Sequence, residues 1–137
     1  VYYTEHGGFD THVNQAFRHA QLLTQLDQAL TAFQKDLERQ GLAEQVVVLA
    51  FSEFGRRVRE NQSAGTDHGV AAPVFLAGSR VRGGFHGEFP SLVDLDRGDL
   101  KHSVDFRQVY AAVLDRWLGV DSRKVLRGRF PGLAVLG

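Results

Sequence analysis

The sequence predicts an α/β fold with a mainly parallel sheet, and three segments near its start carry that prediction. Residues 1–3 (VYY) have the β-branched and aromatic composition of a short strand. Residues 14–40 repeat apolar side chains every three or four positions, which is typical of an amphipathic helix. Residues 46–51 (VVVLAF) are apolar without polar alternation, as in a strand covered on both faces. Strand, helix and strand in this order predict a βαβ unit with parallel strands.

The long helix is the best defined of these elements. Its opposite face is charged, and Gly41 stands where a helix C-cap belongs. The apolar stripe that we expect to face the sheet consists of Ala16, Ala20, Leu23, Leu26, Leu30, Phe33 and Leu37.

The second half of the chain adds a third strand and two more helices. PVFLAG (73–78) reads as a short strand, whereas residues 80–104 are rich in Gly, Arg and Asp and read mostly as loop. A second helix begins near Asp105, and a short helical turn spans about 122–126. The inward stripe of the second helix is Phe106, Val109, Tyr110, Val113, Leu114, Trp117 and Leu118.

Composition narrows the classes of function. Sixteen basic residues balance sixteen acidic ones and are scattered, so no broad positive field is expected for nucleic acid or anionic lipid. With no cysteine, any metal has to be held by histidine and carboxylate. No apolar run approaches the roughly 20 residues of a membrane span. The chain begins at Val1 without a methionine or an export signal, so we expect 1–137 to be a single but incomplete domain.

Candidate site residues follow the first two predicted strands. Asp10 and His12 lie in the first loop, and the loop after VVVLAF carries Glu53, Asp67 and His68. Because parallel strands end at the same edge of a sheet, we expect these side chains to converge. Imidazole and carboxylate suit zinc, manganese or iron, so Asp10, His12 and His68 are the first candidate ligands, with Glu53 and Asp67 next. The alternative is a pair of solvated loops, in which case Glu53, His12 and His68 lie far apart.

Other polar residues of the second loop have two readings each. Glu53, at a strand tip, is a candidate ligand or general base, or else an ion-pair partner of Arg56 or Arg57. The two arginines suit an anion, or else they neutralise nearby carboxylates. Asn61 is the candidate substrate-binding amide. Ser52 lacks the flanking glycines of an exposed nucleophile, so no nucleophile is assigned in this chain.

The motifs GGFDTH, FSEFGRR, EN, GTDHG and PVFLAG, with DFRQVY ahead of a WLG helix, resemble in this order the C-terminal part of the DUF1501 family. This is a group of bacterial proteins of unknown function, and the resemblance covers essentially the whole chain. The family resembles the alkaline phosphatase and sulfatase superfamily, which implies a three-layer α/β/α sandwich with a mainly parallel sheet. It also implies that 1–137 is the C-terminal portion of a larger DUF1501 domain, in an exported, periplasmic or secreted protein.

The resemblance also implies roles for particular residues. Asp10 and His12 match the superfamily's Asp-and-His motif after a strand, and His68 matches a later metal-binding histidine. Glu53 would replace an aspartate ligand, and Phe54 stands where a further metal-binding histidine would be. Phenylalanine cannot ligate a metal, so a second metal position would have to rely on another oxygen, for which Asp67 is the candidate.

Two hypotheses of function follow. The first is a metal-dependent hydrolase of phosphate or sulfate esters that binds zinc or manganese, with the fragment inactive alone because the superfamily's nucleophile lies on an earlier strand. Its partner would be a small anionic ester. The second is a non-catalytic extracytoplasmic binding protein that keeps the fold, and Phe54 in place of a ligand favours it.

Overall fold

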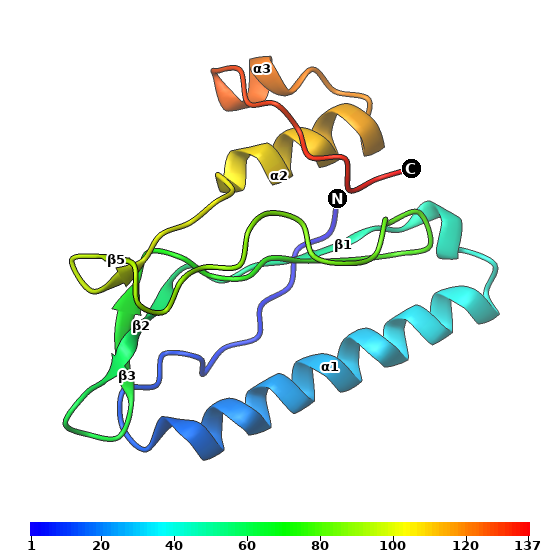
Figure 1. Cartoon of the computed structure of the whole chain (residues 1–137). Coiled ribbons are helices and arrows are strands. Elements are labelled where there is room, and N and C mark those ends of the chain that lie inside the picture. Colours follow the sequence, from blue (N-terminus) through cyan, green and yellow to red (C-terminus); the bar gives the residue numbers. More distant parts are fainter.

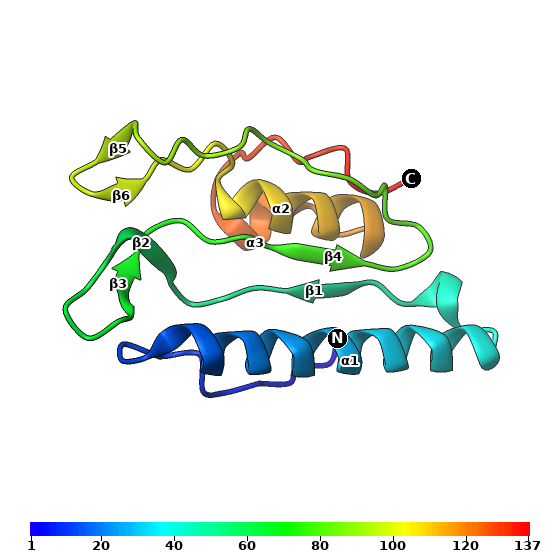
Figure 2. The ribbon, with the colours of Figure 1, turned by 60° about the horizontal axis from the view of Figure 1, so that its bottom comes forward.

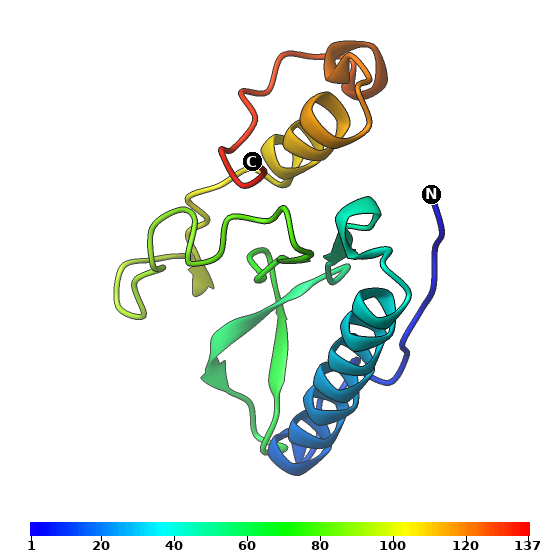
Figure 3. The same ribbon diagram turned by 90° about the vertical axis from the view of Figure 1, so that its right-hand side faces the viewer.

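A computed structural model describes all of residues 1–137 (Figure 1). A long helix, α1 (Gln15–Arg39), and a shorter helix, α2 (Phe106–Ala112), lie on opposite sides of two strands, β1 (Val48–Ala50) and β4 (Phe75–Ala77), as Figures 2 and 3 show. The remaining elements are η1 (Ala43–Gln45), β2 (Gly55–Glu60), β3 (Thr66–Gly69), β5 (Leu95–Asp96), β6 (Asp99–Leu100), η2 (Val113–Trp117) and α3 (Ser122–Leu126).

The predicted parallel sheet, and with it the three-layer α/β/α sandwich with a mainly parallel sheet, is wrong. The strands form three separate two-stranded antiparallel sheets, β1 with β4, β2 with β3, and β5 with β6. Residues 1–3 are in no strand, and Val1 and Tyr2 are fully exposed. VVVLAF instead pairs with PVFLAG, with Leu49 opposite Leu76. The residues of β1 are half-buried, whereas Phe51 and Phe75 remain about half exposed. An apolar run indicates a covered strand, but it carries no information on the direction of the neighbouring strand.

The long helix is confirmed close to its predicted limits. Its end is closed by Gly41, which adopts φ 68°, the left-handed conformation that glycine reaches without strain. Leu22 and Leu37 are its buried side chains, whereas Phe17 and Phe33 remain 76% and 45% exposed. The helix therefore leaves much of its apolar surface open.

The hydrophobic core is small and lies between the two strands and the C-terminal segment. Ala112, Val135 and Leu136 are its buried members, and Leu76 and Trp117 pack against them. Only 10 of 137 residues are buried, and the surface area is 10119 Å², whereas a compact protein of this mass exposes about 7,100 Å². None of the helices has the length and apolarity that a membrane span requires.

Residues 94–100 contain a hairpin where the sequence indicated loop. The two residues between β5 and β6, Arg97 and Gly98, have φ of 51° and 91°, the pair of positive values that a tight two-residue hairpin turn needs. Asp99 of this hairpin pairs with Arg57 of β2 at 3.5 Å. The β5–β6 hairpin is thereby joined to the β2–β3 hairpin.

The start of α2 was predicted near Asp105, and the structure confirms it. The Asp105 carboxylate accepts a hydrogen bond from the Arg107 backbone N–H, and the Gln108 side chain accepts one from the Asp105 backbone N–H. The Arg107 guanidinium also pairs with this carboxylate and, as the largest cause, lowers the pKa of Asp105 to about 2.

This cap makes a testable prediction about acid. A carboxyl group with a depressed folded pKa stabilises the fold fully above its ordinary pKa of 3.8 and loses that contribution as pH falls toward about 2. The Asp105→Asn variant keeps a capping oxygen but does not titrate. Urea unfolding followed by circular dichroism between pH 5 and pH 2 should therefore show a smaller loss for the variant than for the wild type. If the wild type and the variant lost equal stability between pH 5 and pH 2, Asp105 would not contribute to the acid sensitivity of the fold.

Candidate metal centre

The three side chains predicted as the first metal ligands lie together beside the β2–β3 hairpin. Nε2 of His68 lies 2.7 Å and Nε2 of His12 lies 2.9 Å from Oδ1 of Asp10, and the two Nε2 atoms are 3.1 Å apart. The side chains of Asp10, His12 and His68, the triad, are 65%, 42% and 44% exposed. All three side chains are therefore open to solvent.

Hydrogen bonds from the hairpin hold the loop that carries Asp10 and His12. Arg56 on β2 donates from Nη1 to the Thr66 carbonyl and from Nη2 to the Phe9 carbonyl, both at 2.6 Å. A third contact, from Nη2 to the Thr11 hydroxyl, is 3.4 Å long. Arg56 thus fastens the residues on either side of Asp10 to the strand that carries His68.

The same loop is also fixed through its backbone. The Asn14 and Gln15 N–H groups donate to the carbonyls of Ser63 and Ala64 in the β2–β3 turn, each at 2.9 Å. These are the first backbone groups of α1, so the turn satisfies donors that a helix start would leave free. The triad is held between a helix start and a hairpin.

Phe54 orients the third member of the triad. Its ring stacks on the His68 imidazole with centroids 3.8 Å apart and planes 8° apart, and the Arg56 guanidinium lies 5.1 Å from the Phe54 ring centroid. The stack restricts rotation of His68 about its side-chain bonds. Phe54 stands where the superfamily pattern would have a further ligand, and in this structure it supports the ligand candidate His68 instead.

Asp67 and Asn61 lie behind His12 and not among the donor atoms. Oδ1 of Asp67 is 3.9 Å from Nδ1 of His12, the ring nitrogen that faces away from the triad. The Asn61 amide donates to the His12 carbonyl at 3.1 Å and to Asp67 Oδ1 at 3.4 Å, and Asn61 Oδ1 accepts from the N–H groups of Ser63 and Gly65. Both side chains are thus engaged in holding His12.

The remaining predicted site residues lie outside the cluster. Glu53 is exposed and is not among the residues whose donor atoms come together. Arg57, the residue after Arg56 on β2, pairs with Asp99. The Ser52 hydroxyl donates to the Phe54 carbonyl at 2.7 Å. The structure thus brings Asp10, His12 and His68 together and gives both arginines other partners.

Comparison with known proteins identifies the family of the chain. A family model described as "Protein of unknown function (DUF1501)" matches residues 3–130. The chain belongs to the DUF1501 family. Neither the curated proteins nor the solved structures include a match to it. The resemblance of the family to the alkaline phosphatase and sulfatase superfamily therefore stays an expectation.

The charge state of Asp10 favours binding of a cation by the triad of this DUF1501 protein. The pKa of Asp10 lies below its ordinary value; the hydrogen bond with His68 is the largest cause, desolvation opposes it, and the hydrogen bond with His12 adds to it. The carboxylate is therefore fully ionised at neutral pH. An ionised carboxylate beside two imidazole nitrogens is a donor set suited to zinc, manganese or iron.

Sequence reasoning missed the residues that position the triad. Arg56 was considered as an anion binder, and Phe54 only as a missing ligand. Gly65 was not considered, although a Cβ there would lie 2.2 Å from the His12 carbonyl oxygen. The glycine in GTDHG was the available signal, because glycine is used where two backbone segments approach closely.

The close approach at Gly65 gives a prediction. In Gly65→Ala the methyl group would meet backbone atoms of His12, so the loop has to move away from the hairpin. We expect at least about tenfold weaker zinc binding and a destabilisation on the order of 1–3 kcal/mol. Gly83→Ala is the matched control, because nothing lies within 4 Å of a Cβ at Gly83. Calorimetric zinc titration and urea unfolding of both variants would measure this, and wild-type values for Gly65→Ala would contradict it.

Proposed function

We propose that this DUF1501 protein is a metal-dependent hydrolase of phosphate or sulfate esters, with one divalent ion held by Asp10, His12 and His68. The observation that carries the metal proposal is the donor arrangement, with edges of 2.7, 2.9 and 3.1 Å between one carboxylate oxygen and two imidazole nitrogens. Zinc or manganese is the expected ion, since the donor set contains no sulfur.

The residues present fit such an ion. A single point can lie about 2.1 Å from all three donor atoms, which is the usual zinc–nitrogen distance. Three protein ligands leave further coordination positions open to solvent, as in catalytic sites. Because the triad is about half exposed, an ester could reach those positions.

Neighbouring side chains favour the form of each ligand that a metal requires. A metal-binding histidine commonly directs its other ring N–H toward a carboxylate, and Nδ1 of His12 faces Asp67 at 3.9 Å. A hydrogen on Nδ1 leaves the Nε2 lone pair of His12 directed at the triad. The Phe54 ring fixes the plane of His68.

The chemistry expected of the site is simple. A bound divalent ion would stabilise the negative charge that develops on an ester during hydrolysis and would make water a stronger nucleophile. Asp10, His12 and His68 would hold it, and Glu53, exposed at the start of the second loop, remains the candidate general base. Substrate contacts by Arg56, Arg57 and Asn61 remain a prediction, with Arg56 and Asn61 already engaged in holding the loop.

Metal titration and ester turnover test this proposal. Calorimetry of the full-length protein with zinc and with manganese should give one ion per triad, because Phe54 cannot provide a second set of ligands. The metal-loaded protein should hydrolyse generic phosphate or sulfate monoesters, and a chelator should stop the reaction. Binding of one ion without turnover across a broad ester panel would reject the hydrolase.

A non-catalytic extracytoplasmic binding protein is the second candidate. The partners of the arginines favour it. Arg56 donates to backbone carbonyls and Arg57 pairs with Asp99, so neither of the two predicted anion-binding arginines is free to bind an ester at the triad. The Ser52 hydroxyl is likewise bound to a carbonyl. This candidate predicts that the metal-loaded protein binds a small anionic ester and releases it unchanged. An extracytoplasmic location is part of both proposals.

A further inference from the structure

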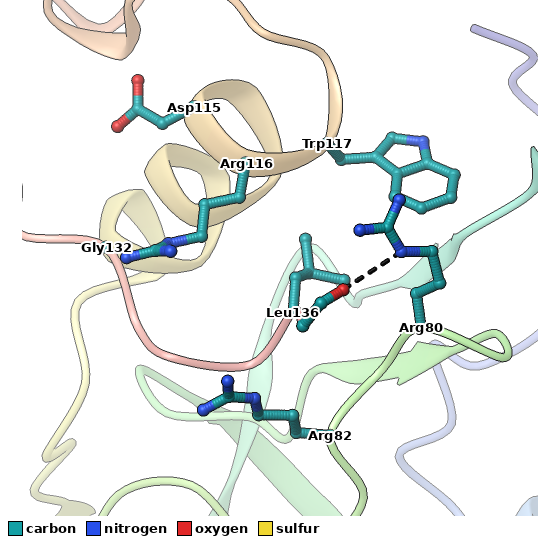
Figure 4. A pocket seen from close by; sticks show the side chains of 8 residues that line it. Arg80, Arg82, Asp115, Arg116, Trp117, Gly132 and Leu136 are labelled. Atoms are coloured by element: carbon teal, nitrogen blue, oxygen red, sulfur yellow. Dashed lines mark hydrogen bonds between the residues drawn. The ribbon is translucent and has the colours of Figure 1, made fainter.

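A second group of charged side chains lies away from the triad, beside the C-terminal segment. A hollow of about 590 Å³ opens there, and Figure 4 shows three arginines around it. The C-terminus and the β2–β3 hairpin lie at opposite ends of the molecule in Figures 1 and 2. We call this hollow the arginine pocket; its lining includes Arg80, Arg82, Arg116, Trp117, Asp115 and Gly137.

Positive charge is concentrated in the arginine pocket although the whole chain is neutral. The guanidinium groups of Arg82 and Arg116 make no hydrogen bond or ion pair, and Arg80 uses only Nε, which donates to the backbone oxygen of Gly137 at 3.0 Å. Six other basic side chains of the protein do pair with carboxylates. The pocket therefore offers unused guanidinium donors at one place.

The acidic residue of the arginine pocket does not neutralise these donors by direct pairing. Both carboxylate oxygens of Asp115 are taken by Ser122, whose backbone N–H and hydroxyl donate to them at 2.8 and 2.9 Å. Asp115 is thus bound to the first residue of α3. The ion pairs of the arginines and lysines in the structure do not include Asp115.

The backbone under the arginine pocket is fixed. Val81 and Leu136 form an antiparallel bridge, flanked by hydrogen bonds from the Arg82 N–H to the Val135 carbonyl at 2.9 Å and from the Gly137 N–H to the Arg80 carbonyl at 3.1 Å. Val135 and Leu136 belong to the core. Arg80 and Arg82 therefore project from a backbone that is anchored on both sides.

Trp117 gives the pocket an aromatic wall. The Arg80 guanidinium lies 5.7 Å from the Trp117 ring centroid, within reach of a cation–π interaction. This contact holds Arg80 on the side of the hollow toward the tryptophan, whereas Figure 4 shows Arg82 and Arg116 reaching to the other side of Leu136.

We propose that the arginine pocket binds a multiply charged oxyanion, the phosphate group of a small organic molecule. Guanidinium forks match phosphate oxygens with paired hydrogen bonds, and Arg82 and Arg116 have all their donors free for this. The hollow is larger than one phosphate and falls in the size range of small-molecule sites, so it has room for the organic part against Trp117. The proposal does not depend on the triad or on its metal.

Binding should be measured on the full-length protein carrying His12→Ala and His68→Ala, in the presence of a chelator, so that no metal at the triad can hold the anion. The probes are glucose 6-phosphate, inorganic phosphate and, as a singly charged control, acetate. We expect both phosphates to bind at least about tenfold more tightly than acetate. If glucose 6-phosphate binds more tightly than inorganic phosphate, the organic part contacts Trp117. Equal affinities would indicate that the pocket recognises the phosphate group alone.

A matched pair of variants locates the binding. Arg82→Gln with Arg116→Gln should weaken glucose 6-phosphate binding at least about tenfold, because charge-assisted hydrogen bonds are lost. Arg127→Gln with Arg129→Gln removes the same charge from two exposed arginines outside the hollow and should leave the affinity within about twofold. Circular dichroism spectra would check that both proteins are folded. Phosphates that bind no better than acetate, or two double variants that weaken binding equally, would overturn the proposal.

Discussion

Replacing His12 and His68 with alanine should abolish calorimetric zinc binding by this DUF1501 protein. The double variant removes two of the three donor atoms that lie within 3.1 Å of one another and leaves Asp10 as a single exposed carboxylate. Loss of a residue that only supports a ligand typically costs about 10–100-fold in metal affinity, so loss of two ligands should cost at least about 100-fold. Titration with zinc and with manganese, in competition with a chelator, would measure the change.

Two controls separate coordination from a general effect of removing imidazole or charge. His86→Ala with His102→Ala removes two exposed histidines of the 80–104 segment and should leave zinc affinity unchanged. Asp67→Asn should weaken binding by about tenfold, because the Asp67 carboxylate faces Nδ1 of His12 and does not lie among the donors. Identical isotherms for the wild type and the His12→Ala, His68→Ala protein would end the metal proposal and the hydrolase with it.

The local features of this fold were predictable and its strand directions were not. Spacing of apolar residues located α1 to within a residue at each end, and Asp105 located the start of α2. VVVLAF and PVFLAG were correctly expected to be extended. Their antiparallel pairing was missed. The chain between the two strands forms the β2–β3 hairpin and returns without a helical crossover, and the composition of the strands does not indicate this connection.

The triad was expected for a reason that the structure does not support. Convergence was predicted from two parallel strands ending at one edge, yet Asp10 follows no strand and His68 lies within β3 of an antiparallel hairpin. What brings them together is the docking of the N-terminal loop on that hairpin. This docking depends on Arg56 and Gly65. The glycine indicates that some backbone segment approaches closely, but the sequence does not say which segment, and an arginine does not indicate its partner.

Removal of the Arg56 guanidinium should lower both stability and zinc affinity, although Arg56 is not one of the donor residues. In Arg56→Gln the two 2.6 Å hydrogen bonds to the Phe9 and Thr66 carbonyls are lost, and the half-buried carbonyls lose a charged donor. Hydrogen bonds to charged groups contribute about 1.5–3 kcal/mol, so we expect a loss of unfolding free energy on the order of 2 kcal/mol. The loop that carries Asp10 and His12 would also be released from the hairpin, which should weaken zinc binding by about tenfold.

The adjacent arginine supplies the matched control for this prediction. Arg57 has the same side chain one position along β2, but it makes only a 3.5 Å ion pair with Asp99 and is 45% exposed. Because exposed ion pairs contribute at most about 1 kcal/mol, Arg57→Gln should lower stability by less than Arg56→Gln and leave zinc affinity unchanged. Urea unfolding and zinc titration of both variants, with hydrogen exchange at residues 9–12, would test the difference. Equal losses of stability, with wild-type zinc affinity in both variants, would show that Arg56 does not anchor the triad. The anchoring would then have to come from the Asn61 amide and the backbone contacts of Asn14 and Gln15.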